Sequence, residues 1–207
     1  MIKDTNKGSI LILSGPSGCG KSSLLKELYE QIDNYYFSIS TTTRDIRDGE
    51  KHGVDYFFVS KEEFEQDIED NNFLEYALVH GNYYGTSLKP INEALKKKML
   101  VIFDIDIQGH ELVRKKLDDL TTSVFITTPS LKELENRLNS RATDNKDVIS
   151  NRIKNAKIEI NSIDKYDYFI INDDLLIAAK ELISIAIASQ KKESLFSKDS
   201  IIKDWLN

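Results

Sequence analysis

The chain has 207 residues, of which 40% are hydrophobic and 30% charged, enough for one large domain or for one domain with inserted lobes. Its net charge of −6 argues against a general surface for DNA or RNA, and no apolar run approaches the about 20 residues that cross a bilayer. The single cysteine excludes an internal disulfide and the start, "MIKDTNKGSI", lacks the apolar segment of a secretion signal, so we expect a cytoplasmic protein without nucleic-acid or membrane partners.

The first predicted unit is a strand, a glycine-rich loop and a helix. The apolar segment "SILILS" at residues 9–14 runs into "SGPSGCGKSS", and helical spacing follows at residues 22–32. The loop matches G-x-x-x-x-G-K-[ST], in which backbone N–H groups and a helix N-terminus hold phosphates, the lysine bridges the terminal phosphates and the next hydroxyl meets magnesium. The predicted phosphate-binding residues are Gly15, Pro16, Ser17, Gly18, Cys19, Gly20, Lys21 and Ser22.

Residues 36–90 interrupt the alternation of strands and helices. The segments "FSIS", "DYFFVS" and "FLEYALVH" are typical of short strands, and one helix is predicted at residues 61–71. We therefore predict a mixed α+β lobe inserted into the core.

The rest of the chain returns to strand and helix in turn. Strands are predicted at residues 99–106, 122–128 and 168–172, and helices at residues 107–117, 131–138, 148–160 and 175–189. The strands are almost continuously apolar, as in a parallel sheet covered on both faces, so the pattern predicts an α/β fold with a doubly wound parallel sheet.

Two further segments stand out. The polar patch "NSRATDNKD" at residues 139–147 separates two predicted helices and is a candidate lid. Near the end of the chain, Ile201, Ile202, Trp205 and Leu206 have the spacing of an amphipathic helical turn, which we expect to dock on the body of the protein.

An acid ends the predicted strand "VIFD". Such a strand accompanies phosphate-binding loops of this kind, so Asp104 is a candidate magnesium residue acting through water; a plain carboxylate at a strand end is the alternative.

The stretch from Asp106 to Gly109 matches the D-x-x-G element of GTP hydrolases. Those enzymes also read guanine with an N-K-x-D motif, and the nearest stretch here, "DNKDV", has its acid one position early. This disfavours a GTPase.

The inserted segment carries residues suited to a nucleoside monophosphate. Arg44 and Arg47, together with tyrosine hydroxyls, suit a phosphate monoester because the guanidinium fork matches its oxygens. Glu75 and Asp106 could accept the N1–H and N2–H₂ donors of guanine, which adenine does not present in that arrangement. A phosphate acceptor is already anionic, so it needs positioning rather than deprotonation by a base.

Three arginines flank the candidate lid. Arg137 and Arg141 are four residues apart on one helix face, and Arg152 lies on the next predicted helix. Closing the lid would bring cations onto a transferring phosphoryl group and expel water; the alternative is a set of solvated helix faces.

Together these stretches resemble the guanylate kinase family from about Gly8 to Ser189. The motifs that carry the resemblance are "SGPSGCGKSS", "TTTRDIRDGE", "DYFFVS", "FLEYA", "GNYYGTS", "FDIDIQG" and "YFIINDD". The resemblance implies a P-loop core of residues 1–37 and 91–207, a GMP-binding lobe of residues 38–90 and a helical lid at about 138–155. It also implies transfer of a phosphoryl group from ATP to GMP, and to dGMP, with Mg²⁺.

The resemblance also implies roles for individual residues. Gly15 through Ser22 would hold the ATP phosphates, with Ser22 and Asp104 at Mg²⁺, and Asn172 would lie near adenine. The GMP phosphate would be held by Ser40, Arg44, Arg47, Tyr56 and Tyr84, and guanine would be read by Glu75, Thr86 and Asp106. Lys21, Arg44, Arg137, Arg141 and Arg152 would carry the catalysis. In the lid, Ala142 stands where the family usually has a glycine.

Two other functions remain open. One is a non-catalytic guanylate-kinase-like module that binds proteins, and the other is a P-loop kinase for a different nucleotide. The sequence does not decide between a monomer and a homo-oligomer.

Overall fold

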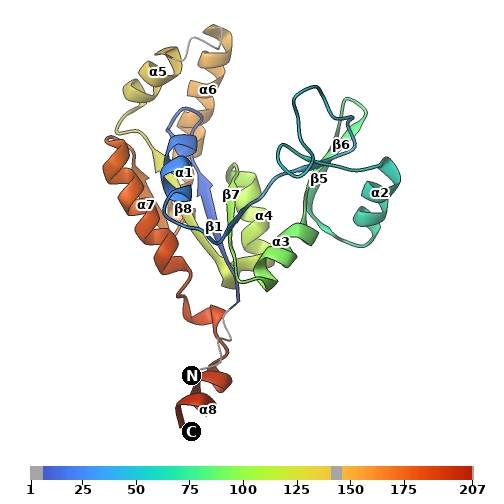
Figure 1. Ribbon diagram of the computed structural model, residues 1–207. Helices are drawn as coiled ribbons and strands as arrows, with labels where there is room; N and C mark the ends of the chain where they lie inside the picture. Colours follow the sequence, from blue (N-terminus) through green and yellow to red (C-terminus); the bar gives the residue numbers. More distant parts are fainter. Residues whose placement is uncertain (1–6, 141–145, 207) are drawn as a thin grey trace.

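The computed structural model describes residues 7–140 and 146–206. A parallel five-stranded sheet forms its centre, in the order β2-β7-β1-β8-β9 (Figure 1). Its strands are β1 (Ser9–Ser14), β2 (Tyr35–Phe37), β7 (Leu100–Asp104), β8 (Thr121–Thr127) and β9 (Tyr168–Ile171). The predicted doubly wound α/β core is confirmed. None of the helices within the described ranges has the length and apolar character needed to cross a membrane.

Helices cover both faces of this sheet. They are α1 (Lys21–Tyr29), α3 (Leu88–Lys96), α4 (Ile107–Leu117) and α7 (Leu175–Ser189). Leu11 and Leu13 of β1 lie in a buried cluster with α1 and α7, whereas Ile10 and Ile12 lie in a second cluster with α3 and α4. Neighbouring strand residues point to opposite faces, so a continuously apolar strand needs helices on both. The glycine-rich loop and Asp104 lie at the carboxyl ends of β1 and β7, where ligands bind in sheets of this kind.

The predicted mixed lobe is also present. Its sheet has the order β4-β3-β6-β5 and consists of β3 (Thr41–Thr42), β4 (Phe57–Phe58), β5 (Phe73–Val79) and β6 (Asn82–Ser87). Helix α2 (Lys61–Glu69) begins with a capping box formed by Ser60 and Glu63. Its one buried side chain, Phe64, stacks on Phe73 and Tyr83 with ring centroids 4.2 Å and 5.0 Å apart. This aromatic stack attaches the helix to the lobe sheet.

The strand predicted at residues 37–40 is wrong in detail. The chain instead forms β2 at Tyr35–Phe37, which pairs with β7 at the edge of the core, and β3 at Thr41–Thr42, which belongs to the lobe. Local strand propensity does not reveal which sheet a segment joins. Residues 38–40 are therefore the crossing from the core to the lobe.

Two helices stand beyond the carboxyl ends of the strands (Figure 1). These are α5 (Leu131–Ser140) and α6 (Lys146–Glu159), which flank the predicted lid patch. A Cβ on Gly18 would lie 2.8 Å from the side chain of Leu138 and 3.4 Å from that of Leu134. Since glycine has no side chain, α5 packs directly on the phosphate loop.

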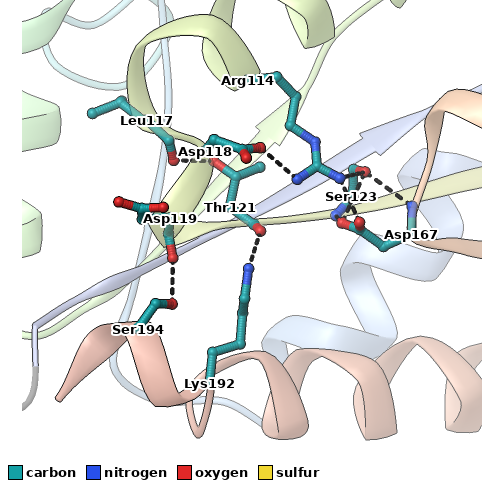
Figure 2. Close-up of polar contacts among 9 residues, drawn as sticks. All are labelled: Arg114, Leu117, Asp118, Asp119, Thr121, Ser123, Asp167, Lys192 and Ser194. Carbon is teal, nitrogen blue, oxygen red and sulfur yellow. Dashed lines mark hydrogen bonds and ion pairs between the residues drawn. The ribbon is translucent and has the colours of Figure 1, made fainter. Parts of the chain in front are cut away.

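The helical turn expected at Ile201, Ile202, Trp205 and Leu206 is present, but its expected docking on the body is wrong. After α7, the short helix η3 (Glu193–Leu195) docks firmly: Leu195 is fully buried, and Lys192 Nζ donates to Thr121 O at 2.6 Å (Figure 2). The final helix, α8 (Lys198–Leu206), buries no residue and leaves Trp205 76% exposed. Amphipathic spacing predicts the helix, but it does not predict a surface that receives its apolar side.

Candidate active site

The glycine-rich loop joins β1 to α1 and carries Lys21. Gly15 has a φ of 143°, and a Cβ there would lie 1.9 Å from the carbonyl oxygen of Ile126, so a side chain does not fit. Lys21 Nζ donates to Gly15 O at 2.8 Å, which folds the lysine back over the loop. The loop leads directly into the first turn of α1, where the N–H groups of Ser23 and Leu24 donate to Gly20 O and the positive end of the helix dipole faces the loop. This is the form of a phosphate cradle.

A cavity of about 370 Å³ opens over the loop. Besides the loop residues it is lined by Asp104 at the end of β7, by Asp106 and by Glu159 at the end of α6. Asp104 Oδ1 lies 3.8 Å from Lys21 Nζ. Burial raises the pKa of Asp104, and the charge of Lys21 acts against this shift. The cavity therefore pairs a cation with carboxylates.

The oxygen ligands that line this cavity suit a nucleotide with bound Mg²⁺. Ser22 and Asp104 both line it, and a hydroxyl with one carboxylate suits Mg²⁺, which keeps several waters and uses few protein ligands. Across the described ranges, no group of three or more His, Cys, Asp or Glu is placed to bind a metal. An ion here would be held jointly with the phosphates of its ligand.

Asn172 supports the loop from within the protein. Its side chain is almost completely buried, and its Nδ2 donates to Cys19 O at 2.8 Å. Its backbone N–H donates to Thr127 O at 2.7 Å, so the residue ties the loop to the ends of β8 and β9. Burial raises the pKa of the Cys19 thiol beside it. The contact of Asn172 with adenine stays a prediction, while its amide already has a partner in the loop.

A second cavity, of about 450 Å³, lies between the lobe and the core. Glu75 of β5, Thr86 of β6 and Asp106 supply its polar groups, and Leu74 and Phe103 are among its apolar residues. Thr86 Oγ1 donates to Glu75 Oε1 at 2.5 Å, which fixes the orientation of the carboxylate. The three residues predicted to read guanine thus line one cavity with apolar walls and oxygen acceptors.

Asp106 lines both cavities. Its Oδ1 accepts a hydrogen bond from the N–H of Gly109 at 2.8 Å and so caps α4. The D-x-x-G spacing is therefore a helix cap, which accounts for the match without a GTP hydrolase. The two cavities adjoin at this residue.

Arg44 is held in place by contacts on several sides. Its Nη2 donates to both carboxylate oxygens of Glu50, at 2.8 Å and 3.0 Å. The rings of Tyr56 and Phe58 each lie 5.6 Å from its Cζ. The hydrogen bond to Glu50 raises the pKa of Arg44, with a further contribution from Tyr84, and it lowers the pKa of Glu50. The guanidinium is a pre-positioned cation.

Of the other residues predicted at the GMP phosphate, Tyr56, Tyr84 and the backbone of Arg47 lie around Arg44. Tyr84 contacts Tyr56 edge to face, with ring centroids 6.1 Å apart. The backbone N–H of Arg47 donates to Glu50 Oε2 at 2.9 Å, and Ser40 lies on the crossing into β3. Tyr84 is two residues before Thr86 on β6, so both side chains point to the same face. The residues around Arg44 therefore continue along β6 from the second cavity.

Of the three arginines predicted to flank the lid, the structure describes two, Arg137 and Arg152. Arg137 Nε donates to Glu133 Oε1 at 2.8 Å, on its own helix. Arg152 lies on α6 and is partly exposed, whereas Arg141 and Ala142 lie outside the described residues. Convergence of these arginines on a phosphoryl group stays a prediction.

Sequence reasoning missed two site residues. Glu50 is part of "TTTRDIRDGE". The one sequence signal for its ion pair with Arg44 is that it lies six residues later, across a turn. Glu159 reaches the phosphate cavity through the course of α6, and no motif marks it.

Comparisons with known proteins identify the family. The family model described as "Guanylate kinase" matches residues 7–189. The chain is 56% identical to a guanylate kinase of Sulfurimonas denitrificans, with 96% of each chain covered. It is 52% identical to one of Wolinella succinogenes, covering 98% of this chain and 94% of that one.

A solved structure agrees with these sequence matches. It is the crystal structure of guanylate kinase from Anaplasma phagocytophilum, which is 34% identical, superposes with a TM-score of 0.64 and covers 92% of this chain and 90% of its own. The match extends over both the parallel core and the mixed lobe, since it includes nearly the whole chain. The chain therefore belongs to the guanylate kinase family.

Proposed function

We propose that this protein transfers the terminal phosphoryl group of ATP to GMP, and to dGMP, giving ADP and GDP. The observation that carries the proposal is a pair of adjoining cavities that share Asp106. One is built around a phosphate loop, and the other contains the fixed carboxylate of Glu75. Membership in the guanylate kinase family supports the same reaction.

On the donor side, the loop from Gly15 to Ser22 would hold the ATP phosphates. Lys21 would neutralise charge on the terminal phosphates, with its present bond to Gly15 O showing that it reaches over the loop. Mg²⁺, held by Ser22 and through water by Asp104, would supply further charge neutralisation when bound. Asn172 would keep the loop in shape through Cys19.

On the acceptor side, the lobe of residues 38–90 would bind GMP. Arg44, Arg47, Ser40, Tyr56 and Tyr84 would hold its phosphate, because guanidinium and hydroxyl donors match phosphate oxygens. Glu75, Thr86 and Asp106 would read guanine. The carboxylates would accept from N1–H and N2–H₂, a pair of donors that adenine lacks.

The chemistry then needs alignment more than acid–base catalysis. The phosphate of GMP is anionic at neutral pH, so the lobe has to aim one of its oxygens at the terminal phosphorus of ATP. Arg137, Arg141 and Arg152 would approach when the lid closes, stabilise the developing charge and exclude water. Because both substrates are intracellular and Cys19 is an unpaired thiol, we place the reaction in the cytoplasm.

The test is ADP release with GMP, AMP, UMP and CMP as acceptors. The proposal predicts that GMP is strongly preferred and that activity requires Mg²⁺. Equal or higher activity with AMP contradicts guanine selection and favours a kinase for another nucleotide. Absence of both turnover and ATP binding favours a non-catalytic module.

Two isosteric variants test the assigned base contacts. We expect Glu75→Gln and Asp106→Asn each to raise the KM for GMP by about 10- to 100-fold, because a charge-assisted acceptor is lost or replaced by a donor. Gln can still accept from Thr86 and Asn can still cap α4, so the fold is preserved. ATP affinity, measured by equilibrium binding, should stay within about twofold of the wild type. Unchanged KM for GMP in both variants would contradict these roles.

A further inference from the structure

The phosphate cavity is more acidic than a site for a polyanion normally is. Among the described residues that line it, Asp104, Asp106 and Glu159 carry carboxylates, and Lys21 alone carries a positive side chain. Sites for phosphate are normally cationic, because like charges repel one another strongly where water is partly excluded. This lining therefore suits a polyphosphate whose charge is already partly neutralised when it binds.

Glu159 differs from the other two carboxylates in its lack of protein contacts. Asp104 lies near Lys21, and Asp106 accepts a hydrogen bond from Gly109. Glu159 ends α6 and is half-buried, yet among the described residues none donates a hydrogen bond to its carboxylate and no cation lies within ion-pair distance of it.

The surroundings of Glu159 do not favour its charge. Burial raises its pKa, the charge of Lys21 acts against this shift, and Asp106 adds to it. A carboxylate that is partly withdrawn from water normally has a partner, since lost hydration costs free energy. Glu159 therefore calls for a cation that arrives with the ligand.

The acids of the cavity do not form a metal site by themselves. Within the described ranges, no three His, Cys, Asp or Glu side chains are close enough together to ligate a metal. Asp104 and Glu159 come from different elements, the end of β7 and the end of α6. Mg²⁺ keeps several of its waters and takes phosphate oxygens as further ligands. Carboxylates that stand apart can then act on the ion through its waters.

We propose that Glu159 is a second acid for the Mg²⁺ of the donor nucleotide, acts on it through water, and makes the cavity selective for ATP with bound Mg²⁺ over free ATP. The inference rests on the proposed function, because it needs ATP as the donor. When Mg²⁺ is present, the charge of Glu159 attracts the ion; when it is absent, the same charge repels the triphosphate. Glu159 is thus a positioning residue that acts through the metal and need not touch ATP.

Equilibrium binding of ATP without GMP, measured by calorimetry in MgCl₂ and in EDTA, tests this role. The variant Glu159→Gln keeps the shape of the side chain and removes its charge, and Asp104→Asn removes the acid already assigned to the ion. Glu135→Gln, at an exposed acid of α5 that lines neither cavity, is the matched control. Each protein gives one ratio, the dissociation constant in EDTA divided by that in MgCl₂, and circular dichroism verifies folding.

The expected change is in this ratio. The wild type and Glu135→Gln should bind ATP more tightly in MgCl₂ and share the same ratio. In Glu159→Gln the ratio should fall by about tenfold, because the dissociation constant rises in MgCl₂ and falls in EDTA. By thermodynamic linkage, the affinity of Mg²⁺ for the complex with ATP falls by the same factor, which a magnesium titration at saturating ATP measures. Asp104→Asn should change the ratio in the same direction.

Three outcomes overturn this inference alone. The first is a wild type that binds ATP equally well in both solutions, and the second is an unchanged ratio in Glu159→Gln with Mg²⁺-dependent binding in the wild type. The third is a shift of both dissociation constants by the same factor, which would make Glu159 a part of the cavity wall only. A wild type that binds no ATP in either solution overturns the proposed function itself, and the inference with it.

Discussion

Glu50 is the residue that gives Arg44 its position in the candidate acceptor site. Both of its carboxylate oxygens accept hydrogen bonds from Nη2 of Arg44, and Oε2 also accepts one from the backbone N–H of Arg47. A guanidinium held in this way loses less conformational freedom when a phosphate arrives. Glu50 therefore acts through another residue and need not contact GMP itself.

We predict that Glu50→Gln raises the KM for GMP roughly tenfold while kcat falls less, since the variant loosens the cation that receives the phosphate. The KM for ATP should not change. Steady-state kinetics with each substrate varied in turn measure both values, and Glu69→Gln at the end of α2 is the matched control. An equal rise in both KM values would show general damage to the fold instead.

At the residue scale, the sequence predicted the geometry of the glycine-rich loop because its residues form one short local pattern. The glycines of the loop and the lysine at residue 21 are adjacent in the chain, so their geometry follows from backbone rules. Glu159 reaches the same cavity only because α6, far along the chain from the loop, ends there. No spacing rule predicts a contact that depends on the direction of a distant helix.

A polar cluster fastens the starts of β8 and β9 to the end of α4 (Figure 2). The carboxylate of Asp167 accepts from the backbone N–H of Ser123 at 2.8 Å and forms an ion pair with Arg114. Arg114 also bonds Asp118 at 2.7 Å. Burial alone would raise the pKa of Asp167, but the hydrogen bonds from Ser123 and Arg114 outweigh it and hold this pKa below its usual value. The ionised carboxylate is therefore favoured by folding.

We predict that Asp167→Asn lowers the free energy of unfolding at pH 7 by about 1–2 kcal/mol, since a hydrogen-bonded ion pair is lost at a partly exposed site. A carboxylate whose pKa is lower in the folded state stabilises the protein above its unfolded pKa and stops doing so as the pH falls through the folded value. The deficit of the variant should therefore shrink below about pH 4.

Urea denaturation at pH 7, 5 and 3.5 measures this deficit, with the exposed Asp33→Asn as the control. A deficit that stays constant down to pH 3.5 would mean that the charge of Asp167 does not contribute.

At the scale of elements, the sequence predicted most of the core because its strands are continuously apolar and its helices keep one spacing. β1 begins and ends where expected, as do α4 and α7. The lobe was harder, since β3 and β4 have two residues each and are held by pairing with strands far along the chain. Such short strands carry little periodic signal of their own.

At the scale of the whole molecule, the sequence did not distinguish surfaces that are covered from surfaces that are open. α7 and α8 both carry apolar residues at helical spacing. One side of α7 is buried in the core, whereas no residue of α8 is buried. What differs is the presence of a receiving surface, and this depends on how the rest of the chain folds. The segment between these helices, η3, does find one, because Leu195 is buried and its carbonyl oxygen accepts from the N–H of Lys7 at 2.9 Å.

This division predicts how the protein responds to truncation. A chain ending at Ser197 loses only α8, so we expect its melting temperature at low protein concentration to stay within about 2 °C of the wild type. A chain ending at Lys191 also loses η3, with Leu195 and the bond from Lys192 to Thr121, and should be less stable by about 2–5 kcal/mol, as for removal of a buried leucine. Leu195→Ala in the full chain is the matched variant and should reproduce most of that loss. Thermal and urea denaturation of all four proteins decide the matter: if the chain ending at Ser197 is as unstable as the chain ending at Lys191, then α8 contributes packing energy that its exposure does not account for.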